Sequence, residues 1–445
     1  MRFRFLVAAY ATVLTLASLQ PALAFCGFYV AKADASLFNQ ASQVILARDG
    51  TRTVITMLND YQGDPSEFAM VVPVPVVLGK DDVRIAEKRI FERLDAYSTP
   101  RLVEYFDPDP CKPVPSMFEA LSRDRFLLAN RNVRDEVERA HTLGVTIENS
   151  FSVGEYEILI LSAKESDGLE TWLGENGYRL PSGASAALRP YIRQDMKFFV
   201  AKVKLSEHAA GAAKMLRPLQ FSFESARFML PLRLGMLNAK GPQDLIIYAL
   251  SSRGRVEATN YQTLELPTNV ALPVALKDPQ AFRSFYARMF GKAADAHGLR
   301  AVFTEYVWDM GWCDPCAAEP LNDDELVAAG ADWAVGTREI TSSRPNAPAR
   351  PGVQLVLPTQ AVLTRLHLRY TPATFPEDLV LQETADRRNF QARYILRHAH
   401  PIARGACPMA SSYLELVAKR QRDEKQTLER LAGWTVDDLK ARATR

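Results

Sequence analysis

The residues best suited to chemistry in this sequence are Cys313 and Cys316, which lie in the segment WCDPC. Two thiols separated by two residues can close a small disulfide ring, or they can exchange a disulfide with another protein. In an exchange reaction Cys313 would attack as a thiolate and Cys316 would resolve the mixed disulfide. That reaction requires an exposed first thiol, best placed at the N-terminus of a helix, where the helix dipole favours the thiolate.

The residues around the two cysteines favour different functions. Trp312 before the first cysteine and Pro315 before the second make the motif similar to that of thiol–disulfide oxidoreductases. Asp314 departs from that motif, because a negative charge between the thiols opposes thiolate formation. Pro320 leaves little room for a helix directly after the motif. We therefore favour a structural Cys313–Cys316 disulfide and keep redox catalysis as the alternative, and we predict no other catalytic residue.

The N-terminus predicts export. Arg2 and Arg4 precede an apolar run, and the segment ALA that ends at Ala24 fits a signal-peptide cleavage site. The run is short for a membrane span, which needs about 20 residues, and no later segment is long and apolar enough for a stable span. We expect cleavage after Ala24 and a mature chain in the periplasm or outside the cell.

Export would place all five cysteines where disulfides persist. If Cys313 pairs with Cys316, a further bridge is possible among Cys26, Cys111 and Cys407, and one thiol is left over. The sequence alone leaves open which two of these three form the bridge.

Charge limits the class of partner. The formal net charge is +2, and removal of Arg2 and Arg4 with the signal peptide leaves 52 basic and 52 acidic residues. Nucleic acids and anionic membrane surfaces attract proteins with a basic face. We therefore expect no nucleic-acid partner, and the sequence identifies no other partner.

Other polar pairs have simpler explanations than a site. His398 and His400 would share one face of a strand, but no third ligand lies close to them, so we expect a surface pair rather than a metal site. Asp107 and Asp109 lack the spacing of a known calcium loop and fit turn chemistry. Motifs of hydrolases and of phosphate-binding loops are absent from the sequence. We predict no metal and no cofactor.

Regular elements flank the cysteine motif. An amphipathic helix over Pro279 to Lys292 precedes an apolar strand that starts at Ala301, and a helix over Asp323 to Ala329 follows, capped by Asn322. Three tryptophans of this region are expected to fill a core and its rim rather than to line a ligand groove: Trp308, Trp312 and Trp333.

The rest of the chain alternates between strands and a few helices. A hairpin is expected over residues 43–58, and a helix over Glu87 to Tyr97. The strand from Phe68 to Val77 contains prolines, which places it at a sheet edge or makes it bend off the sheet. The longest helix covers Tyr413 to Ala432, with a capping box from Ser412 and a stop at the following glycine.

This pattern predicts an α+β fold with mostly antiparallel sheets, a few interspersed helices and a long C-terminal helix. After the signal peptide (1–24) we expect an N-terminal α+β domain (25–207), a middle β-rich region with the CxxC (215–341), and C-terminal strands plus the long helix (353–445). An Ala/Gly-rich stretch from His208 to Lys214 and a Pro-rich loop from Ser342 to Gly352 separate them.

Eight segments carry a family resemblance: FCGFYVAKADASLFNQASQVILARDGTRTVITM, FAMVVPVP, LDAYSTPRLVEYFDPDPC, VGEYEILILSA, KFFVAKV, EYVWDMGWCDPC, DLVLQETADRRNFQARYILRH and YLELVAKRQRDEKQTLERLAGW. They resemble the exported bacterial proteins classed as domain of unknown function 2330. The resemblance covers nearly the whole mature chain, is least distinctive over Pro113 to Thr142, and implies one family unit over residues 25–445. It implies no activity, cofactor or catalytic residue.

These observations together favour an exported, non-catalytic protein with a binding or envelope-associated role. The export signal, the neutral charge, the β-rich pattern and the incomplete catalytic set support this interpretation. The alternative is an exported thiol–disulfide oxidoreductase that uses Cys313 and Cys316.

Overall fold

The computed structural model describes residues 28–32, 42–59, 68–112, 140–141, 145–176, 178–181, 183–203, 217–238, 241–312, 314, 318–335, 337–340, 353–356 and 361–443. The predicted cleavage site at Ala24 and the cysteines Cys26, Cys313 and Cys316 lie outside the described residues.

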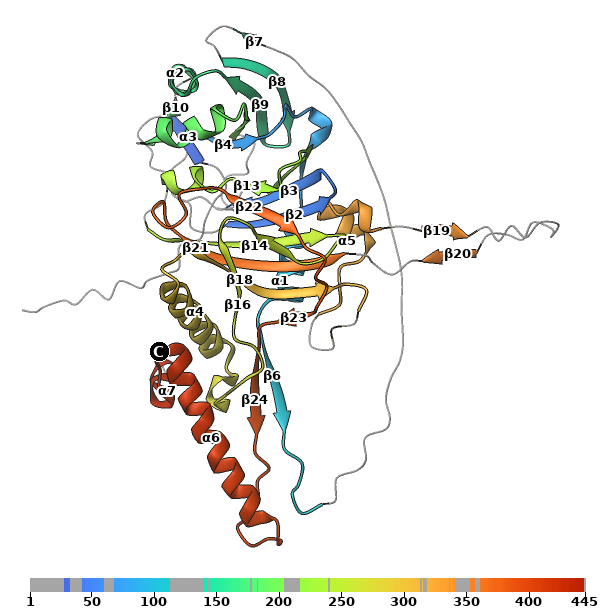
Figure 1. The fold of residues 1–445 in the computed structure, drawn as a ribbon, viewed down its shortest axis with the longest axis vertical. Helices are drawn as coiled ribbons and strands as arrows, with labels where there is room; N and C mark the ends of the chain where they lie inside the picture. The colour runs from blue at the N-terminus through green and yellow to red at the C-terminus, as the bar shows by residue number, and fades with distance from the viewer. Residues whose placement is uncertain are drawn as a thin grey trace, which may run out of the picture.

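Two large sheets form the centre of the molecule (Figure 1). Within the described residues, the first sheet has seven antiparallel strands, in the order β10 (Tyr178–Arg179), β1 (Phe28–Lys32), β4 (Phe68–Val74), β11 (Lys197–Val203), β9 (Tyr156–Ala163), β8 (Val145–Val153) and β7 (Ala140–His141). The second has nine described strands, in the order β16 (Gln262–Glu265), β18 (Ala301–Asp309), β21 (Val362–Tyr370), β14 (Gln243–Ser251), β2 (Ser42–Asp49), β3 (Arg52–Asn59), β12 (Leu219–Glu224) and β5 (Val83–Ile85), with β23 (Phe390–Gln391) paired to β18. In this second sheet β14 pairs with β2, and β16 with β18, in parallel, and the other pairs are antiparallel.

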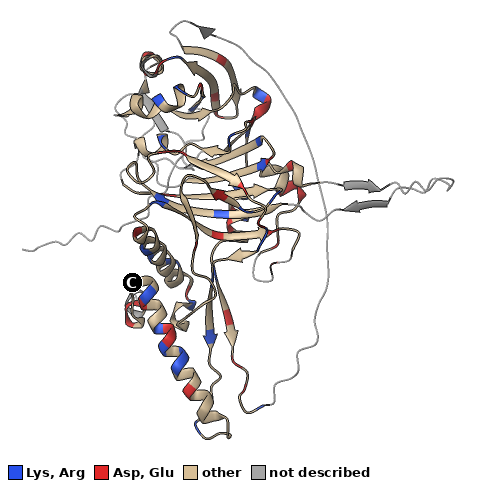
Figure 2. Cartoon of the chain, in the orientation of Figure 1, with Lys and Arg blue, Asp and Glu red and all other residues tan. Residues whose placement is uncertain are grey.

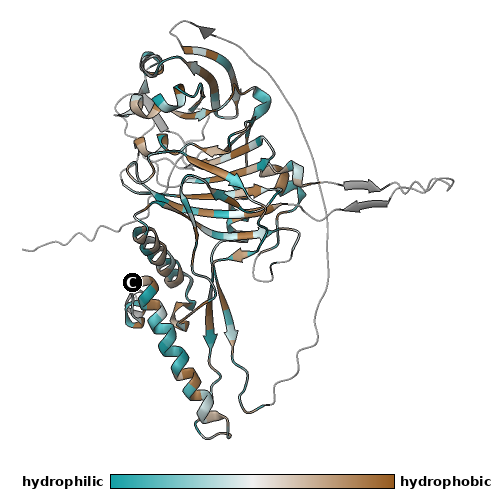
Figure 3. Cartoon of the chain, viewed as in Figure 1, coloured by the Kyte–Doolittle hydropathy of each residue, from teal (hydrophilic) through white to brown (hydrophobic). Residues whose placement is uncertain are grey.

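The central strands of the second sheet, β21, β14 and β2, are buried on both faces. Along β2, Val44 and Leu46 belong to the core shared with the seven-stranded sheet, whereas Ile45 and Ala47 belong to the core on the opposite face. Successive side chains of a strand point to opposite faces, so a strand buried on both sides must be apolar at every position. This requirement explains the continuous apolar run VILA in β2 and the brown strands at the centre of Figure 3.

Helices cover the outer faces, which produces four layers in the described structure. Two helices, α2 (Ser166–Glu175) and α3 (Ala184–Ile192), pack on the outer face of the seven-stranded sheet through Leu169, Leu173 and Leu188. Two others, α1 (Arg89–Ser98) and α5 (Asp323–Ala328), pack on the outer face of the nine-stranded sheet. The order of layers is helices, sheet, sheet, helices.

A long arm projects from the nine-stranded sheet (Figure 1). Its strands β6 (Arg101–Phe106) and β24 (Arg393–His398) run in parallel, and the long helix α6 (Ala410–Ala432) lies beside them. At the base of the arm, α6 packs with α4 (Pro279–Ala296) and α7 (Val436–Ala443). The middle of α6 carries charges of both signs and is hydrophilic (Figures 2 and 3).

The remaining described strands form small sheets: β13 (Met229–Leu230), β22 (Leu379–Glu383) and β15 (Val256–Ala258); β17 (Val270–Leu272), which pairs with β24; and β19 (Thr337–Ile340) with β20 (Val353–Val356). No helix in the described part of the chain is both long enough and apolar enough to cross a membrane.

The predicted α+β fold with mostly antiparallel sheets and a long C-terminal helix is confirmed. Of the two alternatives predicted for the strand Phe68 to Val77, the edge position is wrong, whereas the bend off the sheet is confirmed, because the strand ends at Val74 and the chain bends at Pro75. This strand, β4, pairs with β1 on one side and β11 on the other, but β1 reaches only to Val71, so Pro73 lies beyond that ladder. The capping box predicted from Ser412 is also wrong, because α6 already begins at Ala410.

The predicted domain boundaries stay a prediction. The nine-stranded sheet takes β2 and β3 from the first predicted segment, β12, β14 and β18 from the second, and β21 from the third.

Candidate functional site

The chain around the cysteine motif passes from the surface into the core. After β18 ends at Asp309, the backbone amide of Gly311 donates to the Asp309 carboxylate (3.0 Å), which also forms a salt bridge with Arg387 (2.9 Å). Trp312 is 68% exposed, and two residues later Asp314 is only 8% exposed. Asp314, which directly follows Cys313 in the sequence, is therefore buried.

Asp314 is held in the core by two buried donors. The hydroxyl of Tyr306 and the side-chain amide of Gln391 each donate to Asp314 Oδ2 at 3.1 Å. Asp314 lies in irregular chain, and within the described residues the first helix after it is α5, which starts at Asp323. These two hydrogen bonds fix the Asp314 carboxylate in the core.

A pocket of about 260 Å³ opens beside Asp314. It is lined by Thr268, Asn269, Trp308, Asp314, Asn389, Phe390, Gln391 and Arg393. Arg393 Nε donates to Asn269 Oδ1 (2.8 Å), and the indole of Trp308 donates to the carbonyl of Trp312 (3.1 Å). The walls therefore combine fixed hydrogen-bonding groups with two aromatic side chains, Trp308 and Phe390.

The tryptophans near the motif have different environments. Trp308 is half-buried, packs against the core around Tyr306, and also lines the pocket. Trp333 packs against the same core, as predicted, whereas Trp312 faces solvent.

A buried ionic cluster lies on the same strand as Tyr306. In the pairing of β18 with β21, Thr304 faces Leu366 and Tyr306 faces Arg365, so Glu305 is the extra residue of a β-bulge. Glu305 is 1% exposed and its carboxylate accepts from Arg365 Nε (2.6 Å) and contacts His367 Nδ1 (2.7 Å).

Further groups contact this cluster. The hydroxyl of Tyr286, from α4, donates to the Glu305 carboxylate, and the ring of Phe290 stacks on His367 with centroids 3.6 Å apart. Arg365 also donates to Asp95 Oδ1 (2.6 Å). Burial raises the pKa of Glu305, but attraction to His367 and Arg365 outweighs burial and lowers that pKa to about 2.

Neither this pocket nor the second pocket described below is lined by the ionic cluster. The ion pair between Glu305 and Arg365 links β18 to β21. Sequence reasoning missed it, although charged residues inside apolar strands, such as Glu305 in AVFTEYVWD and Arg365 and His367 in VLTRLHLRY, are the signal that could have found it.

The histidine and aspartate pairs lie on the arm. His398 Nε2 contacts Glu104 Oε2 (2.5 Å) and its ring stacks on Phe106, while His400 Nε2 lies 3.9 Å from Asp109. The described residues contain no group of three His, Cys, Asp or Glu side chains that could hold a metal ion.

Asp107 organises the arm through contacts from other elements. Its carboxylate accepts from Arg420 (2.8 Å) and Tyr413 (2.9 Å) of α6, and Arg397 of β24 lies 3.5 Å away. Asp109 accepts from the backbone amide of Cys111 (2.9 Å), which is the turn chemistry that the sequence predicted.

One disulfide closes the tip of the arm. Cys111 and Cys407 are bonded, with Cα atoms 5.9 Å apart and 296 positions between them in the sequence. This is the pairing that the sequence left open among three cysteines. The described structure neither supports nor excludes a Cys313–Cys316 bridge.

The fold and the site define an α+β protein with two packed sheets, a disulfide-closed arm, and a cysteine motif anchored beside a polar pocket. The family model described as an uncharacterized protein conserved in bacteria (DUF2330) matches residues 20–382. The chain belongs to this family, domain of unknown function 2330, as the sequence resemblance predicted. The matched range ends within β22, so β24 and α6 lie beyond it. No curated protein and no solved structure matches the chain.

Proposed function

We propose that this chain is an exported, non-catalytic binding protein whose CxxC motif is structural. The observation that carries the proposal is the burial of Asp314, whose carboxylate accepts hydrogen bonds from Tyr306 and Gln391. A catalytic dithiol requires a turn at a helix N-terminus. Here Asp314 lies in irregular chain, and among the described residues that follow it no helix begins before Asp323.

The Cys111–Cys407 disulfide supports the export part of the proposal. Such bridges persist in oxidising compartments and are rare in the cytosol. Fractionation of the native host, followed by alkylation of free thiols, tests it. We expect a chain that begins after Ala24, found outside the cytosol, with Cys111 and Cys407 protected from alkylation. Intact precursor in the cytosol with all five thiols alkylated would overturn the export proposal.

The polar pocket beside Asp314 is the proposed binding site. Titration with free amino acids and with monosaccharides, followed by the fluorescence of Trp308, tests it, because a ligand in the pocket changes the surroundings of that indole. Gln391→Leu removes a polar side chain from the wall of the pocket and should abolish the fluorescence change. Trp308→Phe shows whether that change comes from Trp308. A response that survives Gln391→Leu contradicts a site in this pocket.

The exposure of Trp312 is the observation that favours the oxidoreductase alternative, because it places the start of the motif at the surface. An insulin-reduction assay separates the two functions. We expect no turnover by wild type, a reduction potential of the Cys313–Cys316 pair far below that of glutathione, and no change in Cys313→Ser. Cys26→Ser serves as the control for loss of a cysteine outside the motif. Rapid turnover that Cys313→Ser abolishes would establish the oxidoreductase instead.

A further inference from the structure

A second pocket lies between the two large sheets, at the place where prolines end the strands. β4 ends at Val74, between Pro73 and Pro75, and β13 ends at Leu230, directly before Pro231. Proline has no N–H to donate, so it interrupts the ladder of a sheet. The two sheets leave a cleft of about 130 Å³ there.

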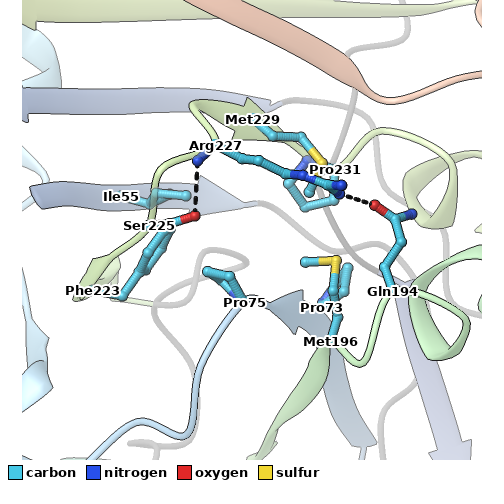
Figure 4. Close-up of a pocket in the computed structure, with 10 residues that line it drawn as sticks. All are labelled: Ile55, Pro73, Pro75, Gln194, Met196, Phe223, Ser225, Arg227, Met229 and Pro231. Carbon is cyan, nitrogen blue, oxygen red and sulfur yellow. Dashed lines mark hydrogen bonds between the residues drawn. The ribbon is translucent and has the colours of Figure 1, made fainter. Parts of the chain in front are cut away.

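The interior of this cleft is apolar. Ile55, Phe223 and Met196 line it and are at most 9% exposed, and Figure 4 shows the thioether of Met196 and the rings of Pro73 and Pro75 facing the same space. The described residues that line the cleft include no carboxylate, histidine or cysteine. The shape and lining of this cleft suit an apolar group.

One cation lies across the mouth. The side chain of Arg227 extends over the cleft (Figure 4) and donates to Gln194 Oε1, while the Arg227 backbone amide donates to Ser225 Oγ (3.1 Å). Arg227 forms no salt bridge with any carboxylate of the described residues, and Asp195, next to Gln194, pairs with Lys197 instead (2.7 Å). Within the part of the chain that the structure describes, the guanidinium is thus a positioned positive charge without a carboxylate partner.

We propose that the cleft binds a small apolar carboxylate, with its apolar group between the sheets and its carboxylate on Arg227. A protein cavity of about 150 Å³ holds benzene, so the apolar group is of benzene size. The planar guanidinium retains donors that suit a carboxylate in a two-pronged hydrogen bond. Two sources share this chemistry: a free arylalkanoic acid, and the C-terminal residue of a peptide that ends in phenylalanine.

Isothermal titration of the full chain tests the proposal with matched probes. 3-Phenylpropionate represents the free acid and acetyl-Gly-Gly-Phe the peptide end, and the corresponding amides lack only the charge. We expect at least one acid to bind, and its amide to bind roughly tenfold or more weakly, because hydrogen bonds to charged groups are the stronger ones. The acid that binds more tightly identifies the source.

Variants test the role of each wall. Arg227→Gln should weaken binding of the acid by roughly 10- to 100-fold and leave the amide unchanged. Arg283→Gln is the matched control, because Arg283 is also an exposed arginine that donates to a glutamine side chain, Gln280 (2.8 Å). Met196→Trp fills the cleft and should abolish binding of acid and amide alike.

Several results would overturn the proposal. The first is that neither acid binds at millimolar concentration. The second is that acid and amide bind equally well, and the third is that Arg227→Gln binds the acid as tightly as wild type does. Urea unfolding confirms that each variant is folded, and if Met196→Trp is not, the acid–amide pairs and Arg227→Gln still decide. The cleft shares no residue with the pocket beside Asp314, so either site can fail without the other.

Discussion

Replacement of Glu305 by glutamine removes the negative charge at the centre of the buried cluster while keeping its shape. Glu305 is 1% exposed and Arg365 is 5% exposed by side chain, so the guanidinium loses a close partner in a place that water does not reach. Breaking a buried ion pair from one side lowers stability by about 3–5 kcal/mol. We expect Glu305→Gln to lower the free energy of unfolding by this amount, measured by urea denaturation at pH 7.

The pH dependence gives an independent magnitude for the same residue. The pKa of Glu305 is lowered from 4.5 to about 2 in the folded chain, which corresponds to about 3 kcal/mol at 1.36 kcal/mol for each pKa unit. Because the folded pKa is the lower one, this stabilisation is complete above pH 4.5 and is lost as the pH falls toward 2. The stability difference between wild type and Glu305→Gln should shrink over that range.

Two controls make the result decisive. Glu87→Gln changes an exposed glutamate on the same protein and should alter stability by less than about 0.5 kcal/mol. The double variant Glu305→Gln, Arg365→Met removes the stranded charge and should recover part of the loss. A loss below about 1 kcal/mol in Glu305→Gln, or a difference that is constant between pH 5 and pH 3, would refute the reasoning.

Three further predictions follow from single positions. Asp314→Ala leaves two buried donors without an acceptor and should lower stability by about 1–3 kcal/mol in urea unfolding, whereas Asp314→Asn should lower it less. Gly330→Ala should destabilise more than Gly298→Ala, because both glycines have positive φ but only at Gly330 would the new Cβ lie 2.5 Å from Val54; equal thermal midpoints would contradict this. Cys407→Ser should make the arm sensitive to limited proteolysis, and wild type in reductant should give the same fragments.

Local signals predicted the helices well. The helix predicted over Glu87 to Tyr97 is α1, Arg89–Ser98, with Ile90 and Leu94 buried as expected. The helix after the cysteine motif begins at Asp323 with Asn322 as its cap, as predicted. Apolar spacing, caps and glycine stops involve residues within a few positions of each other, so the sequence alone carries this information.

Long-range pairings were beyond the sequence. The strand β2 is apolar at every central position, which is typical of burial on both faces, but that pattern does not say which sheet covers which face. The interior position of β4 depends on β1 and β11, which lie before and well after it in the chain. Likewise, the Cys111–Cys407 pair could not be chosen from spacing, because 296 positions separate the two residues.

The candidate site was predicted in part. The residue types identify the motif around Asp314, and the negative charge of Asp314 argues against a reactive thiolate. That carboxylate contacts Tyr306 of β18 and Gln391 of β23. Gln391 lies far from Asp314 in the sequence, so this contact forms only in the folded chain. The cleft beside Arg227 likewise forms only in the folded chain, because residues of both large sheets line it.

The disulfide at the tip of the arm changes what a single cut in the backbone can do. The bond between Cys111 and Cys407 encloses most of both large sheets in one covalent ring. A protease that cleaves one peptide bond between those residues yields two fragments that remain attached to each other. The nicked chain would migrate as one band on a gel without reductant and as two bands with it. A single cleavage between these residues therefore releases no fragment while the disulfide is intact.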